Sequence, residues 1–259
     1  MNQIETAWDP EQYALYSDER LRPARDLLAR VRLDAPEVVY DLGCGAGRAT
    51  AMLAARWPGA RITGIDGSAD MLAAARTRDL KVAWERSDIG GWSPPSPADL
   101  VFSNAALHWL DDHAALFPRL MGQVAPGGAL AVQMPRNHGA PSYTCLAETI
   151  ESGPWRDRLG PLLRRAPVAA PAVYREILAP LSRTLDIWET EYLHVLEGDD
   201  PVVAWTKGSV MRPLIAALDG AEGEAFLADY AARLRPAYPR GPDGRTPFPI
   251  RRLFIVAAR

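Results

Sequence analysis

The sequence predicts an α/β fold, in which helices flank a mostly parallel, doubly wound sheet that carries a helical cap or insertion. Three observations predict it. Strand-like and helix-like stretches alternate over about the first 130 residues, a glycine-rich turn at 43–47 directly follows the first strand, and the alternation breaks after Met134. Strands that alternate with helices at this spacing form parallel sheets. Ligands of such sheets bind beyond the carboxyl ends of the strands.

Most of the expected strands are short apolar runs, the first of them rich in β-branched residues, and strand character returns over 184–195. They cover residues 38–42, 61–65, 81–84, 99–102, 129–134, 184–195 and 253–257. The expected helices have apolar residues at helical spacing, and Ser68 is a plausible N-cap for one of them. They cover residues 8–30, 49–57, 69–76, 112–124, 145–150, 174–181, 201–217 and 222–234.

We expect four segments along the chain. They are an N-terminal helical segment that closes over the ligand, a ligand-binding core, a cap over the substrate site, and the remainder of the sheet with a helical insertion at 201–236. Their expected bounds are 1–35, 36–134, 135–183 and 184–259.

Composition excludes several classes of function. The chain has 259 residues and a formal net charge of −3, so it lacks the basic balance of a nucleic-acid binder. No apolar stretch is long enough to span a bilayer, and the polar N-terminus lacks a secretion signal. Two cysteines, Cys44 and Cys145, favour a reducing, cytoplasmic setting. All but two of the 29 basic residues are arginines.

The strongest local signal is Asp41-Leu42-Gly43-Cys44-Gly45-Ala46-Gly47, between a strand and a helix. Glycines at such a junction permit a tight turn and let a ligand approach the backbone. The third glycine of the dinucleotide fingerprint is replaced by Arg48, and no Lys with Ser or Thr forms a phosphate cradle. The carboxylate of Asp41 suits a cationic ligand group better than a pyrophosphate.

Polar residues also follow the next three strands. Asp66 can accept hydrogen bonds from both hydroxyls of a ribose. Asp88 can accept from the amine of an adenine while Ile89 packs on the ring, and Asn104 ends the fourth strand. Polar residues at four consecutive strand ends indicate one ligand site.

These motifs, within residues 36–134, resemble those of class I S-adenosylmethionine-dependent methyltransferases, whose fold is a seven-stranded Rossmann-like sheet. The resemblance implies S-adenosylmethionine as cofactor, S-adenosylhomocysteine as product, and no metal. Asp41 and nearby carbonyls would then offset the ammonium of the cofactor. The cofactor-binding residues it implies are Tyr13, Arg20, Asp41, Gly43, Cys44, Gly45, Gly47, Asp66, Gly67, Met71, Asp88, Ile89, Asn104 and Ala105.

A closer resemblance runs from near residue 8 to the end and is looser over 135–185. Segments 19–23, 60–66, 103–110, 130–135 and 252–257 carry it. They are similar to methyltransferases of this class that esterify a carboxylate of a small polycarboxylic acid, most closely trans-aconitate. The sequence departs from them at His108, where Gln is expected, and at Cys44-Gly45-Ala46-Gly47, which replaces a loop that contains proline.

This activity requires no general base, because a carboxylate with a pKa near ~4 is ionised at pH 7. Catalysis then depends on alignment and on exclusion of water. A trianionic acceptor needs cations, and arginine donates two parallel hydrogen bonds to a carboxylate. The substrate-binding candidates are Arg22, His108, Trp109, Arg136, Tyr174, Trp205 and Arg212, of which His108 and Trp109 are positioning candidates for catalysis.

Three alternatives remain open at this point. The same scaffold can methylate another small molecule, such as a natural product. The second alternative is a nicotinamide-dependent oxidoreductase. The third is a protein that binds the cofactor but has no activity. The expected partner is a small anionic substrate, with no nucleic acid and no membrane, and the chain is a monomer or a dimer.

Overall fold

The computed structural model describes residues 17–259, which contain a seven-stranded sheet with the strand order β3-β2-β1-β4-β5-β7-β6. The first five strands pair in parallel, and β7 is antiparallel to β5. The sheet is therefore mixed and mostly parallel, as the sequence predicts. The strands are β1 (Val38–Leu42), β2 (Arg61–Asp66), β3 (Ala83–Arg86), β4 (Ala98–Asn104), β5 (Val124–Pro135), β6 (Thr184–Leu196) and β7 (Thr246–Ala258).

The described chain divides into two compact units, and each is treated by itself. The sheet unit holds residues 17–136, 167–190 and 252–259, and the helical unit holds 137–166 and 191–251. The strands β6 and β7 contribute residues to both units. Of the segment 135–183, residues 137–166 belong to the helical unit and 167–183 to the sheet unit.

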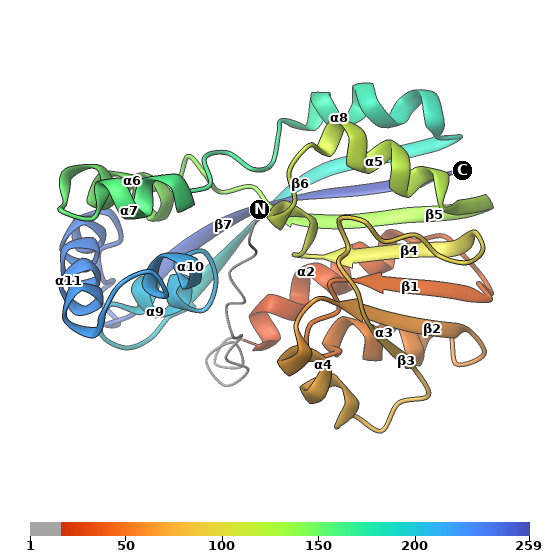
Figure 1. Cartoon of the computed structure of the whole chain (residues 1–259), viewed down its shortest axis with the longest axis horizontal. Helices are drawn as coiled ribbons and strands as arrows, with labels where there is room; N and C mark the ends of the chain where they lie inside the picture. Colours follow the sequence, from red (N-terminus) through yellow and green to blue (C-terminus); the bar gives the residue numbers. More distant parts are fainter. Residues whose placement is uncertain (1–16) are drawn as a thin grey trace. The chain divides into compact units, whose positions relative to one another are not determined.

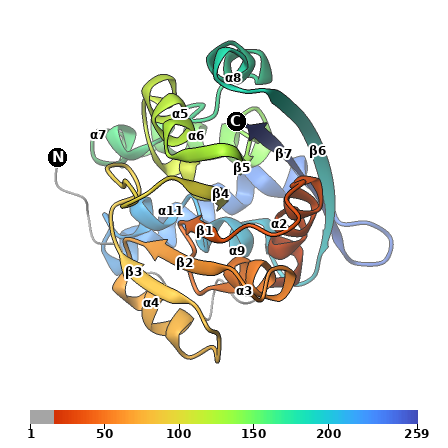
Figure 2. The same cartoon turned by 90° about the vertical axis from the view of Figure 1, so that its right-hand side faces the viewer.

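Helices cover both faces of the sheet unit (Figures 1 and 2). One face carries α5 and α8, and the other carries α2, α3 and α4. Their bounds are α2 (Ser17–Arg30), α3 (Arg48–Arg56), α4 (Ala69–Arg76), α5 (His113–Gly122) and α8 (Pro171–Leu178), with the 3-10 turns η1 (Leu107–Trp109) and η3 (Ala179–Leu181).

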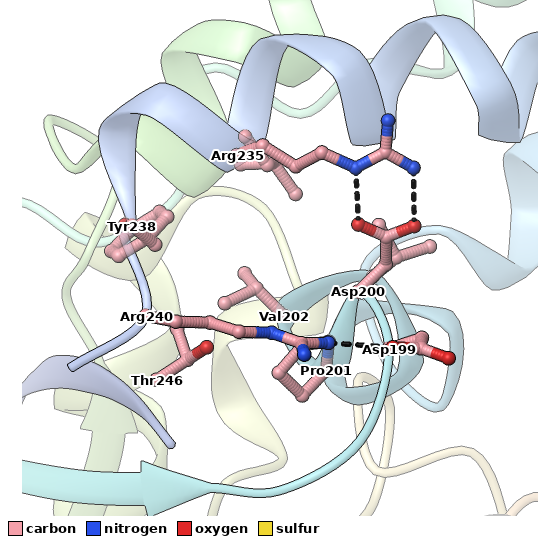
Figure 3. Close-up of a pocket in the computed structure, with 10 residues that line it drawn as sticks. Asp199, Asp200, Pro201, Val202, Arg235, Tyr238, Arg240 and Thr246 are labelled. Atoms are coloured by element: carbon pink, nitrogen blue, oxygen red, sulfur yellow. Dashed lines mark hydrogen bonds and ion pairs between the residues drawn. The ribbon is translucent and has the colours of Figure 1, made fainter. Parts of the chain in front are cut away.

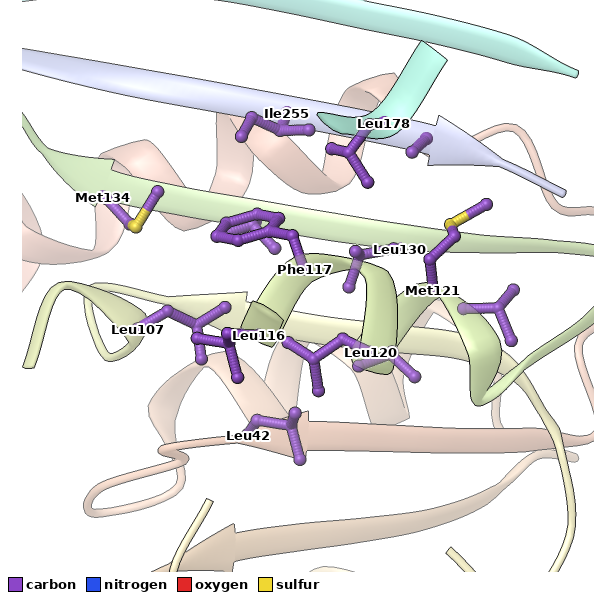
Figure 4. Packing of buried hydrophobic residues seen from close by; sticks show 14 of the residues in the cluster. Leu42, Leu107, Leu116, Phe117, Leu120, Met121, Leu130, Met134, Leu178 and Ile255 are labelled. Carbon is purple, nitrogen blue, oxygen red and sulfur yellow. The ribbon is translucent and has the colours of Figure 1, made fainter. Parts of the chain in front are cut away.

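The main core of the sheet unit lies between the sheet and α5. Phe117, Leu116 and Leu120 of α5 pack against Leu130 and other strand residues, and all are buried (Figure 4). In β5 the alternate residues Leu130, Val132 and Met134 belong to this core. Because side chains alternate across a strand, Gln133 faces the opposite side of the sheet.

The helical unit has a second core of its own. Its helices pack around Phe226 and Tyr230 of α11, together with Trp155 and Met211. The elements of this unit are α6 (Pro141–Ser152), α7 (Arg156–Leu159), η2 (Gly160–Leu162), α9 (Pro201–Lys207), α10 (Arg212–Ile215) and α11 (Gly220–Ala237). Asp219 and Glu222 form a capping box that satisfies backbone N–H groups at the start of α11.

Several elements differ from their predicted bounds. The third strand begins at Ala83 rather than residue 81, and the predicted helix 201–217 is broken between α9 and α10 at Gly208. Pro126-Gly127-Gly128 does not terminate a helix but lies within β5, which pairs with β4 through a register shift between Ala98 and Leu100. The N-terminal helix is described only from Ser17, so its predicted first half lies outside the described residues.

Candidate functional site

The glycine-rich turn is held against β2 by backbone hydrogen bonds. The N–H groups of Gly43 and Cys44 both donate to the carbonyl oxygen of Ile65, at 2.8 and 3.0 Å. Arg78 donates from Nε to the carbonyl oxygen of Ala46 at 2.6 Å, which ties the far side of the turn to the end of α4. The turn is thus fixed from two sides.

Two of the three glycines in this turn are required by space as well as by conformation. Gly43 and Gly47 have φ of 72° and 75°, in the left-handed region. A Cβ atom at Gly43 would lie 2.1 Å from the Cβ of Ala106, and one at Gly47 would lie 2.6 Å from the ring of Trp84. The backbone of the turn therefore lies directly against β4's end and against β3.

Asp41 places a buried carboxyl group under the turn. Its Oδ2 accepts a hydrogen bond from the hydroxyl of Thr50 at 2.6 Å, whereas its Oδ1 is buried with no partner. The pKa of Asp41 is raised to about 7, chiefly by burial; the Thr50 hydrogen bond opposes this shift, and the nearby charge of Asp66 adds to it. A buried oxygen without a partner is costly, so this carboxyl group is suited to a ligand cation.

Asp66 stands at the end of β2 and accepts two backbone hydrogen bonds. Its Oδ2 accepts from the N–H of Gly45 at 2.9 Å and its Oδ1 from the N–H of Ser68 at 2.8 Å. Burial raises the pKa of Asp66, against the lowering effect of these two N–H donors. Each carboxylate oxygen has a second lone pair, so the group can still accept from ribose hydroxyls. Gly67 is exposed beside it, while Met71 is buried in α4.

The adenine candidates lie close to the turn. Ile89 has its Cδ1 3.7 Å from the position that a Cβ would take at Gly43, and it also packs against the main core. Asp88 is exposed, and its Oδ1 accepts from the N–H of Gly90 at 2.9 Å. The carboxylate keeps its other oxygen as an acceptor that a ligand amine can use.

The end of β4 brings two more predicted residues to the same edge. The Oδ1 of Asn104 is buried without a partner. Ala105 has φ of 53°, a strained conformation for a residue with a Cβ, and its N–H donates to the carbonyl oxygen of Gln133 at 2.9 Å. Backbone strain of this kind concentrates at functional sites.

His108 and Trp109 lie on η1, and their rings are 4.9 Å apart at an angle of 39°. His113 of α5 supports this turn. Its Nε2 lies 3.0 Å from the carbonyl oxygen of Leu107, and its Nδ1 lies 2.6 Å from the hydroxyl of Tyr174. With Nε2 protonated, the imidazole donates to Leu107 and accepts from Tyr174.

Tyr174 and Trp205 are core residues of different units. Tyr174 is fully buried in the sheet unit, and its hydroxyl also accepts from the N–H of Ala169 at 3.2 Å. Burial raises the pKa of Tyr174 to about 12. Trp205 is buried in the helical unit between the rings of His194 and Phe248. The structure thus gives both side chains packing roles.

The three candidate arginines have different surroundings. Arg22 is exposed on α2. Arg136 directly follows β5, where its Nε donates to the carbonyl oxygen of Ala169 at 3.0 Å and its Nη1 pairs with Glu189 at 2.8 Å. Arg212 begins α10 in the helical unit and is half-buried.

The structure brings most of the predicted cofactor residues to the carboxyl edge of β1, β2 and β4. Tyr13 lies outside the described residues, and the side chain of Arg20 is not described. Sequence reasoning missed Thr50, Arg78 and Gln133. No signal in their own segments marks them, because Thr50 and Arg78 contribute through hydrogen bonds to Asp41 and Ala46, and Gln133 through its place in the sheet register.

A pocket of about 430 Å³ lies in the helical unit, and none of the predicted site residues lines it. Arg235 donates two parallel hydrogen bonds to Asp200, at 2.8 and 2.7 Å, and Arg240 pairs with Asp199 at 2.6 Å (Figure 3). The contact with Arg235 holds the pKa of Asp200 below its usual value. Both arginines of this pocket are thus paired with acidic side chains of the helical unit.

Among residues 17–259, no group of three or more histidine, cysteine or acidic side chains is arranged to hold a metal ion. Within that same range, no helix is both long and apolar enough to cross a membrane.

Comparisons with known proteins point to one family. A family model described as a methyltransferase domain matches residues 39–128. Trans-aconitate 2-methyltransferase from Azoarcus sp. (strain BH72) is 48% identical over 252 residues, which are 97% of this chain and 99% of that protein. The enzyme of the same name from Pseudomonas aeruginosa (strain UCBPP-PA14) is 45% identical over 98% of this chain and 95% of its own length.

Solved structures share the fold. A methyltransferase from Thiobacillus denitrificans, in complex with S-adenosyl-L-homocysteine, has a TM-score of 0.54 at 19% identity, covering 100% of this chain and 95% of that one. Haemonchus contortus phosphoethanolamine N-methyltransferase 2, in complex with S-adenosyl-L-methionine, has a TM-score of 0.54 at 17% identity and covers 92% of this chain and 52% of that one.

Proposed function

Because the chain belongs to the trans-aconitate 2-methyltransferase family, we propose that it methylates a carboxylate of trans-aconitate with S-adenosylmethionine. The products are the monomethyl ester and S-adenosylhomocysteine. The observation that carries this proposal is the identity of 48% over 97% of the chain to a relative of that name, since agreement of this extent includes the segments on both sides of the cofactor core.

The described residues fit the cofactor. The Oδ1 of Asp41 and the Oδ1 of Asn104 are both buried without partners, and acceptors of this kind suit an ammonium group. The Asp66 carboxylate would take the ribose, while Asp88 and Ile89 would take the adenine. When bound, S-adenosylmethionine supplies a methyl group on a positively charged sulfur.

The chain's own contribution is to bind, orient and desolvate. The acceptor carboxylate is already ionised at pH 7, so no side chain has to remove a proton. We therefore give His108 and Trp109 a positioning role beside the reacting groups, and we assign no general base. Arg22, Arg136 and Arg212 are the proposed cationic partners of the acceptor, because the planar guanidinium matches a carboxylate.

The decisive experiment is a labelled-methyl transfer assay with the purified protein. The panel contains trans-aconitate, cis-aconitate, isocitrate and citrate, together with unrelated monocarboxylic acids and phenols. We expect label to transfer to trans-aconitate with the highest kcat/KM. Transfer only to a phenol or a monocarboxylic acid would leave a methyltransferase with another acceptor and would overturn the proposed substrate.

A further inference from the structure

Gln133 of β5 carries a polar group that the proposed function has not used. Its side chain is fully buried, and both the Oε1 and the Nε2 atom lack a hydrogen-bond partner. A buried primary amide normally satisfies both ends, because leaving them unpaired costs free energy. Gln133 therefore keeps a donor and an acceptor free for a bound ligand.

The register of the sheet places Gln133 beside the site. It pairs with Asn104 of β4 on one side and with Phe254 of β7 on the other. Residues that pair across neighbouring strands project from the same face of a sheet. The amide of Gln133 is thus adjacent to Asn104, whose Oδ1 also lacks a partner.

The order of strands indicates which ligand the amide meets. The cofactor turn follows β1, Asn104 ends β4, and β5 is the next strand along. With strands spaced about 4.8 Å apart, Gln133 lies about 10 Å from the line of β1. The cofactor would lie over the ends of β1 and β4, so an acceptor must approach its reacting end from the side away from β1. On that side of β4 the next strand is β5.

Resting on the proposed function, we propose that Gln133 is a specificity-determining residue whose Nε2 donates a hydrogen bond to a carboxylate of the acceptor. An amide is suited to this role because it offers a donor without adding a charge beside the positive sulfur. Its Oε1 then remains for an ordered water molecule, a common partner of buried polar groups.

The test uses Gln133→Met, which keeps the length and approximate volume of the side chain but removes both polar atoms. We expect the KM for trans-aconitate to rise about 10- to 100-fold, as for loss of a hydrogen bond to a charged group. The Kd for S-adenosylhomocysteine, measured by calorimetry, should stay within about twofold, since that ligand is held from β1, β2 and β4.

Gln133→Glu gives a second readout that a purely structural role would not produce. At pH 8 the carboxylate of the variant repels the acceptor, so KM should rise more than in Gln133→Met. Protonated glutamic acid is nearly isosteric with glutamine and donates from its O–H. The ratio of variant to wild-type KM should therefore fall as the pH is lowered.

Thr149→Val is the matched control, because Thr149 is buried in the helical unit and its hydroxyl is satisfied by the carbonyl oxygen of Cys145 at 2.8 Å. We expect it to lower thermal stability without a change in the acceptor KM. A higher Kd for S-adenosylhomocysteine with an unchanged acceptor KM in Gln133→Met would assign the amide to the cofactor and overturn the proposal. A lower Tm alone would mean a purely structural amide and would also overturn it.

These outcomes differ from failure of the proposed function itself. If the wild-type protein transfers no methyl group to any polycarboxylate, both proposals fall. If the wild type is active on trans-aconitate and Gln133→Met has an unchanged KM, only the role of Gln133 is lost.

Discussion

The carboxyl group of Asp41 combines burial, one satisfied oxygen and one oxygen without a partner. Its pKa is raised to about 7, so a large fraction of the group is protonated near neutral pH when no ligand is bound. A cation placed against Oδ1 favours the ionised form and lowers this pKa. Cofactor binding and release of a proton from Asp41 are therefore linked.

We expect the affinity for S-adenosylhomocysteine to weaken by about tenfold for each pH unit below pH 7. The sign follows from the direction of the shift: the free protein holds a proton on Asp41 below its raised pKa, and that proton must leave before the carboxylate can pair with the ligand ammonium. Calorimetric titrations from pH 5.5 to 8.5, in two buffers of different ionisation enthalpy, measure both the affinity and the released proton.

Asp41→Asn is the control for this linkage, since the amide is similar in shape and does not titrate. It should bind more weakly than the wild type at pH 8 and show little pH dependence between pH 6 and 8. An equal slope of affinity against pH in the wild type and Asp41→Asn would show that another group is responsible.

At the residue scale, the sequence predicted the groups that follow strands and missed those defined by contacts across the fold. Asp41, Asp66 and Asn104 could be found because strand ends are visible as the end of an apolar run. Thr50 and Gln133 could not. The helix α3 brings the hydroxyl of Thr50 to Asp41, and the register between β4 and β5 places Gln133 beside Asn104. Neither arrangement is visible in the local sequence.

At the scale of secondary-structure elements, the glycine-rich turn allows alanine substitutions at Gly43 and Gly45 to be compared. Gly43 and Gly45 both have positive φ, of 72° and 53°. A Cβ at Gly43 would clash with Ala106, whereas nothing lies within 4 Å of a Cβ at Gly45. The two positions therefore differ in available space rather than in backbone conformation.

Gly43→Ala should lower the free energy of unfolding by well over the ~1–2 kcal/mol that left-handed backbone alone costs an alanine, and it should greatly weaken S-adenosylhomocysteine binding. Gly45→Ala should cost only about that conformational amount. Denaturant titration and calorimetry of both variants measure the difference. Equal losses of stability would show that the approach of Ala106 to the turn is unimportant.

The turn η1 depends on a hydrogen-bonded link between α5 and α8. Tyr174→Phe removes the hydroxyl that contacts both His113 and the N–H of Ala169, leaving buried groups unsatisfied at a cost of about 1–3 kcal/mol. We expect a lower Tm and, since His113 also holds the backbone that carries His108, a lower kcat/KM for the acceptor with an unchanged Kd for S-adenosylhomocysteine.

Tyr230→Phe is the matched control for that link, because the hydroxyl of Tyr230 is buried in the helical unit and donates to Ser142 at 2.7 Å. It should lower the Tm while kcat/KM per folded molecule is retained. If Tyr174→Phe affects only the Tm in the same way, the link between α5 and α8 has no part in positioning η1.

Element boundaries failed where local chemistry was ambiguous. Pro126-Gly127-Gly128 is typical of a turn, yet these residues lie in β5, where the pairing with β4 is irregular and tolerates them. Gly208 ends α9, although the apolar spacing over 201–217 is compatible with one continuous helix. In both cases tertiary packing decided between two locally acceptable conformations.

For the whole molecule, the arginines explain how a nearly neutral chain can bind an anion. Many of them are neutralised by acidic partners, including Arg158 with Glu222 and Arg245 with Glu197. The net charge of −3 follows from 29 basic and 32 acidic residues, and these pairs leave fewer arginines free of an acidic neighbour. Any attraction of a trianion must come from the few arginines near its binding site.

Raising the ionic strength from about 0.05 to 0.5 M should increase the KM for trans-aconitate several-fold, because salt screens attraction between exposed charges. The Kd for S-adenosylhomocysteine, which carries no net charge at neutral pH, should change by less than about twofold. Steady-state kinetics and calorimetry in the same salt series provide both values. A KM independent of salt would argue against arginine clamps on the acceptor.

The strand β7 follows all the other described strands along the chain, but it lies between β5 and β6 in the sheet. During synthesis, β6 leaves the ribosome before the strand that joins it to β5 exists. The sheet can be completed only after residues 246–258 have left the ribosome, and a nonsense mutation before Thr246 would remove an interior strand rather than trim an edge. The seven-stranded sheet therefore cannot close while β7 is still inside the ribosome.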